Sequence, residues 1–280
     1  MTVLLDTDIG ADSDDAVALG YLLEQVRKGR CKLPLVSLST ARKGAAGCVR
    51  AILAELASTV KVGRMKKALP CDSYNYYADE VCVAFHTDDR AEESISCWRE
   101  MYKNAEGPIT LIIIGPQTNL AQFLKEEAAL FAQKTACVYM MAGRFDCAEA
   151  EWNVLQDIAA ARYVAQNLPC DGYLLPFEEG CKALTGKKYI GRRDTPIGAC
   201  LQYFALHNGI TDEEMMLRES WDPFTVLSAF RPELFYYSAR GDWQIGSDGV
   251  CRLDPNEKGH FFVLGVKDAA KAAQAIEEAL

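Results

Sequence analysis

The chain has 280 residues, half of them hydrophobic, and 39 acidic against 30 basic residues give it a formal charge of -9 at pH 7. This length and composition predict a large buried core and exclude a disordered or fibrous chain. The negative charge argues against nucleic acid and anionic membranes as partners, because both repel an acidic protein. A small neutral or cationic ligand is the better expectation.

The cysteines and the N-terminal residues indicate the compartment. Eleven cysteines are scattered along the chain without a CxxC pair or a zinc-type spacing, which predicts reduced thiols that fill the core. The sequence runs from Met1 directly into an apolar stretch, with no charged leader, and no later apolar stretch has the length of a membrane span. We therefore expect a cytoplasmic protein without a membrane partner.

The first predicted elements are a strand, an acidic turn and a helix. Residues 3–5 are apolar and predict a buried strand, and residues 6–15 contain five aspartates. Gly10 permits a tight turn, and Asp12 or Ser13 is expected to cap the helix that follows. The carboxylates therefore gather at the end of a strand.

The rest of the chain alternates strands with helices. Further strands are predicted at 33–38, 59–62, 109–114, 136–142 and 173–175, and helices at 45–57, 91–103, from 120 onward, and at 157–166. A loop is expected at 66–89, a turn at 176–180, mostly helix at 195–229, hairpins at 235–266 and a helix at 267–280. This order predicts one α/β domain over 1–280: an open, mostly parallel sheet with helices on both faces and its active site at the carboxyl ends of the strands.

The crowded aspartates predict a metal site. Carboxylates a few ångströms apart repel one another unless a cation neutralises them, and ligands that are all oxygen favour calcium or magnesium over zinc. The alternative is a solvated, capped turn, because one or two aspartates at a helix start are ordinary. An EF-hand is a poorer interpretation, since the twelfth position counted from Asp6 is Val17, where that motif needs Glu.

Three further motifs belong with the acidic turn. They are Ile-Gly-Pro-Gln-Thr-Asn-Leu-Ala at 114–121, Glu-Trp-Asn-Val-Leu-Gln-Asp at 151–157 and Ser-Trp-Asp-Pro at 220–223. With the Asp-Thr-Asp-Ile-Gly-x-Asp-x-Asp-Asp-Ala segment that begins at Asp6, their order and spacing resemble the inosine/uridine-preferring nucleoside hydrolase family along the whole chain. The sequence is most similar to a divergent branch with Trp-Asp in place of His-Asp and with Phe-Glu-x-Gly at 177–180.

The resemblance implies a calcium-dependent N-ribohydrolase that acts on a small-molecule ribonucleoside. It implies a Ca²⁺ ion held by Asp8, both oxygens of Asp15, the Ile114 carbonyl and Asp222. The same family pattern makes Asp8 the base that takes a proton from the attacking water. It assigns substrate contacts to Asp14 at the 2′-hydroxyl, to Glu151 and Asn153 at the other ribose hydroxyls, to Met141 in the pocket wall and to Trp221 at the base. A homo-oligomer, a dimer or tetramer, is also implied.

The residue types suit this chemistry. Cleavage of a C1′–N bond builds positive charge on the ribosyl ring, and carboxylates around that ring stabilise the charge. Buried groups that bind ribose hydroxyls would lose their partners in a deoxyribose, so we expect deoxynucleosides to be rejected.

The sequence departs from the family in the half of the site that holds the base. Trp221 stands where better-known members have a leaving-group histidine, and Trp cannot be a general acid, although it can stack on a base. The Asn that the family carries after the second strand is missing from residues 39–43. We therefore expect an unusual or already activated base, such as a modified base or the cation of nicotinamide riboside. Glu178 or Asp146 is a candidate for the missing acid, against the simpler interpretation of a surface carboxylate.

Two other functions remain as alternatives. The departures are also compatible with a pseudoenzyme that binds a ribosylated ligand or calcium. A strand ending in Asp-x-Asp also occurs in phosphatases of the haloacid dehalogenase type. Those enzymes need Thr or Val where this chain has Gly10, which argues against them.

Overall fold

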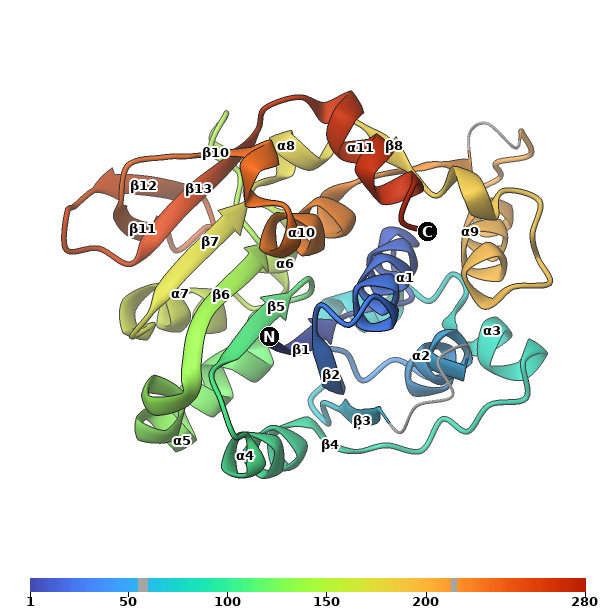
Figure 1. The fold of residues 1–280 in the computed structure, drawn as a ribbon, viewed down its shortest axis with the longest axis horizontal. Helices are drawn as coiled ribbons and strands as arrows, with labels where there is room; N and C mark the ends of the chain where they lie inside the picture. The colour runs from blue at the N-terminus through green and yellow to red at the C-terminus, as the bar shows by residue number, and fades with distance from the viewer. Residues whose placement is uncertain (55–59, 213–215) are drawn as a thin grey trace.

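The computed structural model describes residues 1–54, 60–212 and 216–280 (Figure 1). A single large sheet has the strand order β12-β11-β13-β7-β6-β5-β1-β2-β3-β4, and β10 pairs with β13. Its central strands are all parallel to their neighbours: β1 (Thr2–Thr7), β2 (Lys32–Leu38), β5 (Ile109–Ile113), β6 (Thr135–Met141) and β7 (Asp171–Leu175). The predicted open, mostly parallel sheet is confirmed.

The two ends of the sheet differ. At one end, β3 (Lys61–Arg64) and β4 (Glu92–Glu93) continue the parallel order. At the other end, β13 (Phe261–Val266) is parallel to β7 but antiparallel to β10 (Phe235–Tyr237) and β11 (Gly241–Ile245), and β11 forms the expected hairpin with β12 (Cys251–Pro255). A separate small sheet joins β8 (Leu184–Thr185) to β9 (Arg218–Glu219).

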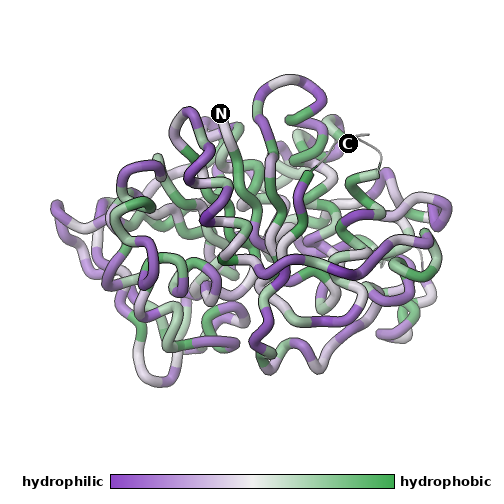
Figure 2. Tube along the Cα trace, turned by 90° about the horizontal axis from the view of Figure 1, so that it is seen from below, coloured by the Kyte–Doolittle hydropathy of each residue, from purple (hydrophilic) through white to green (hydrophobic). Residues whose placement is uncertain are grey.

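Helices cover both faces of the sheet, so that the sheet has a hydrophobic core on each side. One core contains α1 (Asp14–Arg27), α2 (Ala45–Leu53), α3 (Ala78–Ala84), α9 (Pro196–His207), α10 (Trp221–Phe230) and α11 (Ala269–Glu277). The other contains α4 (Ser94–Asn104), α5 (Thr118–Lys134) and α7 (Ile158–Asn167). Successive residues of β1 alternate between them: Leu5 packs in the first core and Leu4 in the second. Figure 2 shows the hydrophobic strands in the middle of the molecule.

Three details differ from the sequence prediction. The predicted loop at 66–89 contains the short helix α3, whose Val81 is fully buried, because packing stabilises short helices that propensity alone does not. The predicted turn at 176–180 contains one helical turn, α8 (Phe177–Gly180). The helix predicted at 45–57 ends at Leu53 in the described residues, and positions 55–57 lie outside them.

The expected side-chain cap of α1 is also wrong. Ser13 occupies the N-cap position, but its side chain makes no capping hydrogen bond. The Asp12 carboxylate instead accepts hydrogen bonds from the Ser13 backbone N–H and from Arg218, at 2.6 and 2.8 Å. The Asp12 carboxylate, which the sequence predicted as a helix cap, therefore pairs with the charged side chain of Arg218 instead.

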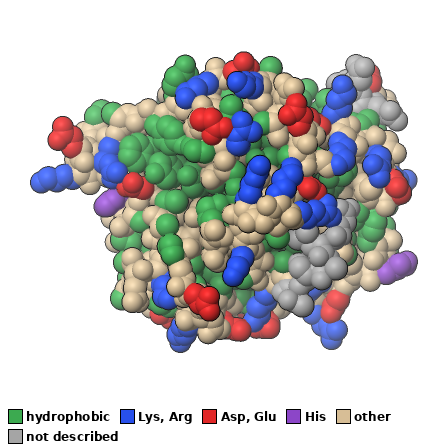
Figure 3. Space-filling view, viewed as in Figure 1, with side chains coloured by type: hydrophobic (Ala, Val, Ile, Leu, Met, Phe, Trp, Pro, Cys, Tyr) green, Lys and Arg blue, Asp and Glu red, His purple; other side chains and the backbone are tan. Residues whose placement is uncertain are grey.

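The surface carries one clear hydrophobic patch in Figure 3, at the upper left, where Figure 1 has β7, β10 and β13. Tyr236 and Tyr237 of β10 are exposed. All eleven cysteines are free thiols and most are buried, as expected. Within the described ranges, no helix combines the length and the apolar character needed to cross a membrane.

Candidate active site

The topology of the sheet places the site. From β1 the chain proceeds to β2 and β3 on one side, while β5, β6 and β7 follow one another on the other side. The carboxyl ends of β1 and β5 therefore flank a point where the strand order reverses, which is where open α/β sheets bind ligands. Asp6 pairs with Ile113 in the register of these two strands, so the residues that follow them, Asp8 and Ile114, emerge side by side.

Two glycines allow the backbone to close around this point. Gly10 has a φ of +121°, and a Cβ added there would lie 2.7 Å from Cδ of Arg42. A Cβ on Gly115 would lie 2.8 Å from the backbone nitrogen of Asp8 and 2.9 Å from its Oδ1. A side chain at either position would displace the acidic turn or its carboxylate. Steric crowding therefore explains why both positions are glycine.

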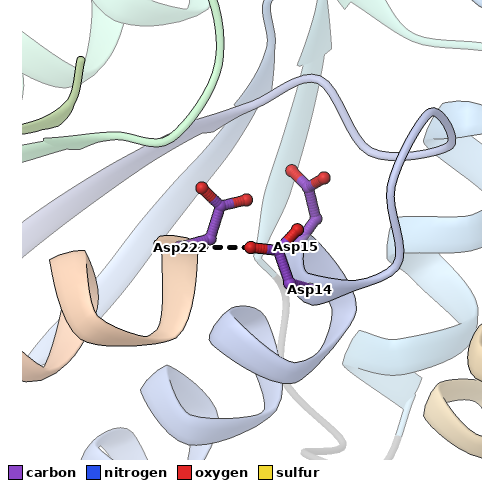
Figure 4. A group of neighbouring side chains, drawn as sticks. All are labelled: Asp14, Asp15 and Asp222. Atoms are coloured by element: carbon purple, nitrogen blue, oxygen red, sulfur yellow. Dashed lines mark hydrogen bonds between the residues drawn. The ribbon is translucent and has the colours of Figure 1, made fainter. Parts of the chain in front are cut away.

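Three buried carboxylates converge beside the turn (Figure 4). Asp14 and Asp15 begin α1 and Asp222 lies in the first turn of α10, and one oxygen of each lies within 4.8 Å of the others. The Asp222 backbone N–H donates to Asp14 at 3.0 Å, and the Thr7 hydroxyl donates to Asp15. Asp14, expected at the 2′-hydroxyl, belongs to this group, whereas Asp8, expected at the metal, lies outside it and lines the same cavity.

Burial sets the electrostatics of these groups. Desolvation raises the pKa values of Asp14, Asp15 and Asp222 well above the ordinary value, and repulsion from neighbouring carboxylates, Asp8 and Asp12 among them, raises these pKa values further. The pKa of Asp8 rises to about 6, again through burial, while the nearby Arg42 guanidinium opposes the rise. The site therefore holds closely spaced carboxylates that a cation would stabilise in their charged form.

Glu151 and Asn153 are fixed by backbone contacts. Glu151 is the N-cap of α6 (Trp152–Gln156), and its carboxylate accepts the N–H groups of Asn153 at 2.6 Å and Val154 at 3.1 Å. Burial raises the pKa of Glu151 to about 7. The Asn153 amide donates to the Met141 carbonyl at 3.2 Å and, at 3.4 Å, to the carbonyl of Ile114. These contacts attach α6 to the ends of β5 and β6.

Arg42 is a buried cation that the sequence prediction missed. Its guanidinium donates to the carbonyls of Asp8 and Ile9 in the acidic turn, the latter at 2.9 Å, and to the Cys71 carbonyl at 2.7 Å. It thereby ties the acidic turn to the 3-10 helix η2 (Pro70–Ser73). Arg42 lies within residues 39–43, where the family's Asn was sought, and its place in that stretch was the signal available in the sequence.

A cavity of about 410 Å³ opens above these groups. All nine residues to which the family resemblance assigned a role line it: Asp8, Asp14, Asp15, Ile114, Met141, Glu151, Asn153, Trp221 and Asp222. The structure therefore brings together groups that lie more than 200 positions apart in the chain. Their individual roles remain predictions at this point.

The other side of the cavity is aromatic, and most of it was not anticipated. Besides Trp221, its lining includes Tyr74, Tyr76, Trp152, Phe177 and Phe204, together with Asn208. Trp221 stacks on Phe177 with ring centroids 5.3 Å apart, and its indole N–H donates to the Phe177 carbonyl at 3.0 Å. We call this side the base half and the carboxylate side the ribose half, after the parts of a nucleoside that the resemblance predicts for them. Trp152 was detectable in the Glu-Trp-Asn motif, whereas the residues of α9 and of the 66–89 stretch had no periodic signal.

The two carboxylates considered as leaving-group acids lie elsewhere. Asp146 forms an ion pair with Arg144 at 2.8 Å on the surface, and Glu178 accepts the Phe145 backbone N–H at 3.3 Å. Neither lines the cavity. Of the histidines, His207 pairs with Glu80 outside the lining. The geometry favours the surface interpretation of Asp146 and Glu178.

The parallel α/β fold and the carboxylate-rich cavity define a class of enzyme suited to hydrolysis through a positively charged transition state. Comparison with known families identifies the family within this class. Residues 3–276 match the inosine-uridine preferring nucleoside hydrolases. The chain belongs to this family and is an N-ribosyl hydrolase, so the resemblance found in the sequence is confirmed. The match decides against the haloacid dehalogenase alternative.

Solved structures show the same fold. The inosine-uridine preferring nucleoside hydrolase from Bacillus anthracis has a TM-score of 0.76 and 18% identity, covering 100% of this chain and 99% of that one. The purine-preferring ribonucleoside hydrolase from Gardnerella vaginalis has a TM-score of 0.76 and 17% identity, with coverage of 100% and 98%. The type III effector protein XopQ, complexed with adenosine diphosphate ribose, has a TM-score of 0.78 and 17% identity, with coverage of 100% and 93%. A comparison with curated proteins found no match.

Proposed function

We propose that this chain, acting as one domain over 1–280, is a calcium-dependent hydrolase of the N-glycosidic bond of a ribonucleoside with a modified or otherwise activated base. The observation that supports this most directly is the convergence of Asp14, Asp15 and Asp222 with Glu151 and Asn153 in one cavity. The products are ribose and the free base.

The residues present fit a hard divalent cation. The donor set is made only of oxygens, three carboxylates lie within 4.8 Å of one another, and all three are buried and crowded. Calcium is the ion we propose, because it accepts six to eight oxygen ligands in irregular geometry. Asp8, Asp15, Asp222 and the Ile114 carbonyl would hold it. When bound, it would lower the pKa of water and orient it.

The chain's own groups then divide the work. Asp8 takes the proton of the attacking water, because it lies at the end of β1 beside the cavity. Asp14 binds the 2′-hydroxyl, and Glu151 and Asn153 bind the other ribose hydroxyls. Met141 packs in the pocket wall, and Trp221 contributes its ring and no proton, because its N–H is already bonded. The carboxylates around the ribose stabilise the positive charge that develops on it.

The test is release of ribose, measured as reducing sugar, from purine, pyrimidine, nicotinamide and modified-base ribosides with calcium added or chelated. We expect turnover of at least one riboside, and Asp8→Asn should reduce it by roughly 10² to 10⁴. Asp254→Asn, the same change on the exposed strand β12, is the control and should leave the rate unchanged. Absence of ribose from every substrate would refute the proposal.

A second candidate is a pseudoenzyme that binds a ribosylated ligand. Its support is the likeness in fold to the effector protein that was solved with adenosine diphosphate ribose. Calorimetry with that compound separates the two: tight binding with no ribose release from any riboside would favour the pseudoenzyme.

We also propose a homo-oligomer, a dimer or tetramer, in the cytoplasm. The free cysteines suit a reducing compartment. The exposed Tyr236 and Tyr237 continue into ring contacts between Tyr173 and Phe262 on neighbouring strands, and such patches mark protein contacts. Light scattering of the wild type and of Tyr236→Glu tests this, and a monomeric wild type would contradict it.

A further inference from the structure

The charge of the cavity is one-sided. Six of the residues that line it are acidic, and no Lys, Arg or His within the described ranges lines it. A divalent ion would offset two of these charges, and Arg42 beside Asp8 and Arg218 beside Asp12 offset two more, which leaves the cavity with an excess of acidic groups and a negative field. Such a field favours a ligand that carries positive charge.

Two rings of the base half form an open aromatic wall. Tyr74 and Trp152 meet with ring centroids 5.6 Å apart at 64°, and they are 45% and 43% exposed. In the part of the chain that the structure describes, no cation lies over either ring. Because the faces of Tyr and Trp attract cations, this aromatic wall is suited to a positively charged ring.

Other rings of the cavity already have a cation. Arg218 lies 4.8 Å from the ring centroid of Phe204, and Arg144 lies 4.9 Å from that of Phe177. Both arginines form ion pairs with two carboxylates, so they do not reverse the negative field. The aromatic wall formed by Tyr74 and Trp152 is therefore the part of the base half that is still free for a charged ligand.

Few groups remain to donate a hydrogen bond or a proton to a base. The Trp221 N–H and the Asn208 amide already donate to backbone carbonyls, at 3.0 and 2.8 Å. The Glu151 carboxylate accepts three backbone N–H groups. The second amide N–H of Asn208, the Trp152 indole N–H and the hydroxyls of Tyr74 and Tyr76 can still donate a hydrogen bond, but of these only the two hydroxyls can give up a proton. A neutral base, which must take up a proton as it leaves, is poorly served here.

We propose that the base half binds a flat heterocycle with a permanent positive charge, so that the preferred substrate is a pyridinium or N-alkylated purine riboside. This rests on the proposed hydrolysis of a ribonucleoside. The water oxygen forms the bond to C1′ as the C1′–N bond breaks, and the nitrogen keeps the electron pair. The base leaves as a neutral molecule, and the proton of the water passes through Asp8 to solvent. No proton has to reach the base.

Binding of two base fragments tests the charge preference separately from turnover. The probes are the N-methyl-3-carbamoylpyridinium cation and neutral nicotinamide, which share a ring and differ in charge, and the measurement is calorimetry with calcium present. We expect the cation to bind roughly tenfold more tightly, the size of a desolvated cation–π contact. Tyr74→Leu should remove most of this preference, while Tyr236→Leu, the same change at an exposed ring outside the cavity, should keep it. Equal or tighter binding of neutral nicotinamide overturns the inference.

Turnover separates this inference from the proposed function. Nicotinamide riboside should release ribose with a higher kcat/KM than inosine. If inosine is the better substrate, the inference fails while the hydrolase stands. If no riboside is cleaved, the proposed function fails, and the two fragments still decide the charge preference.

Discussion

The two halves of the cavity are built in different ways. The ribose half comes from the ends of central parallel strands and from the first turns of α1 and α10, and the start of α6 adds Glu151 and Asn153. Apart from Trp221 at the start of α10, the base half comes from segments outside the sheet: η2 and the residues after it, Trp152 of α6, α8 and the end of α9. The first half is set by the sheet, whereas the second depends on how the surrounding helices and loops pack. We therefore expect strict recognition of ribose and looser recognition of the base.

The sharpest test of this difference is a missing hydroxyl. A 2′-deoxynucleoside with the preferred base should have a kcat/KM lower by about 10⁴, because buried groups of the ribose half would lose their partner. A small change on the base, such as one methyl group, should cost only about 10- to 200-fold. Steady-state kinetics on matched substrates measures both. A deoxynucleoside that reacts as fast as its ribonucleoside would break the comparison.

Arg42 connects the two halves, and its loss should be the next largest effect. Arg42→Met leaves the buried carbonyls of Asp8, Ile9 and Cys71 without their donor, which should lower the free energy of unfolding by about 3 kcal/mol. Denaturant unfolding measures this. Arg50→Met removes a half-buried guanidinium that bonds the Asp88 carbonyl, and it should cost less than about 1 kcal/mol. Equal losses would show that Arg42 does not hold the turn.

Removal of the metal from the ribose half should lower the free energy of unfolding of the protein. Calcium at about 100 times its Kd should add roughly 2.7 kcal/mol to the free energy of unfolding, and a chelator should remove that gain. Thermal unfolding with and without calcium is the measurement. Asp222→Asn should abolish the shift, whereas Asp12→Asn, in the same cavity but outside the group of three carboxylates, should keep it. If calcium still shifts thermal unfolding of Asp222→Asn, the ion binds at another site.

The smallest expected effect concerns the surface carboxylates. Asp146→Asn and Glu178→Gln should leave kcat within about twofold of the wild type, because neither side chain lines the cavity and acid catalysis is worth 10² or more. Ribose release on the best substrate measures this. A drop of a hundredfold in either variant would assign it the role of the missing acid and give the base half a catalytic group.

The sequence predicted the ribose half well for a physical reason. A buried strand that runs into several aspartates leaves a pattern in the chain, so the gathering of Asp8 and Asp15 at a strand end was predictable from the residues, whereas Ile114 was expected only from the family resemblance. Tyr74 and Phe204 left no such pattern, because they reach the cavity from segments whose position depends on tertiary packing. The predicted cap by Asp12 failed for the same reason: its partner, Arg218, is 206 positions away.

The hydrogen bond between Asp222 and Asp14 spans 208 positions of the chain. During synthesis on a ribosome, the early strands and the acidic turn emerge long before α10. In a nascent chain, Asp14 and Asp15 are therefore made long before Asp222, the residue that completes their group. A truncated product that stops before α10 would keep most of the parallel sheet, yet it would lack Asp222 and Trp221 together. Premature termination therefore yields a fragment with no complete site.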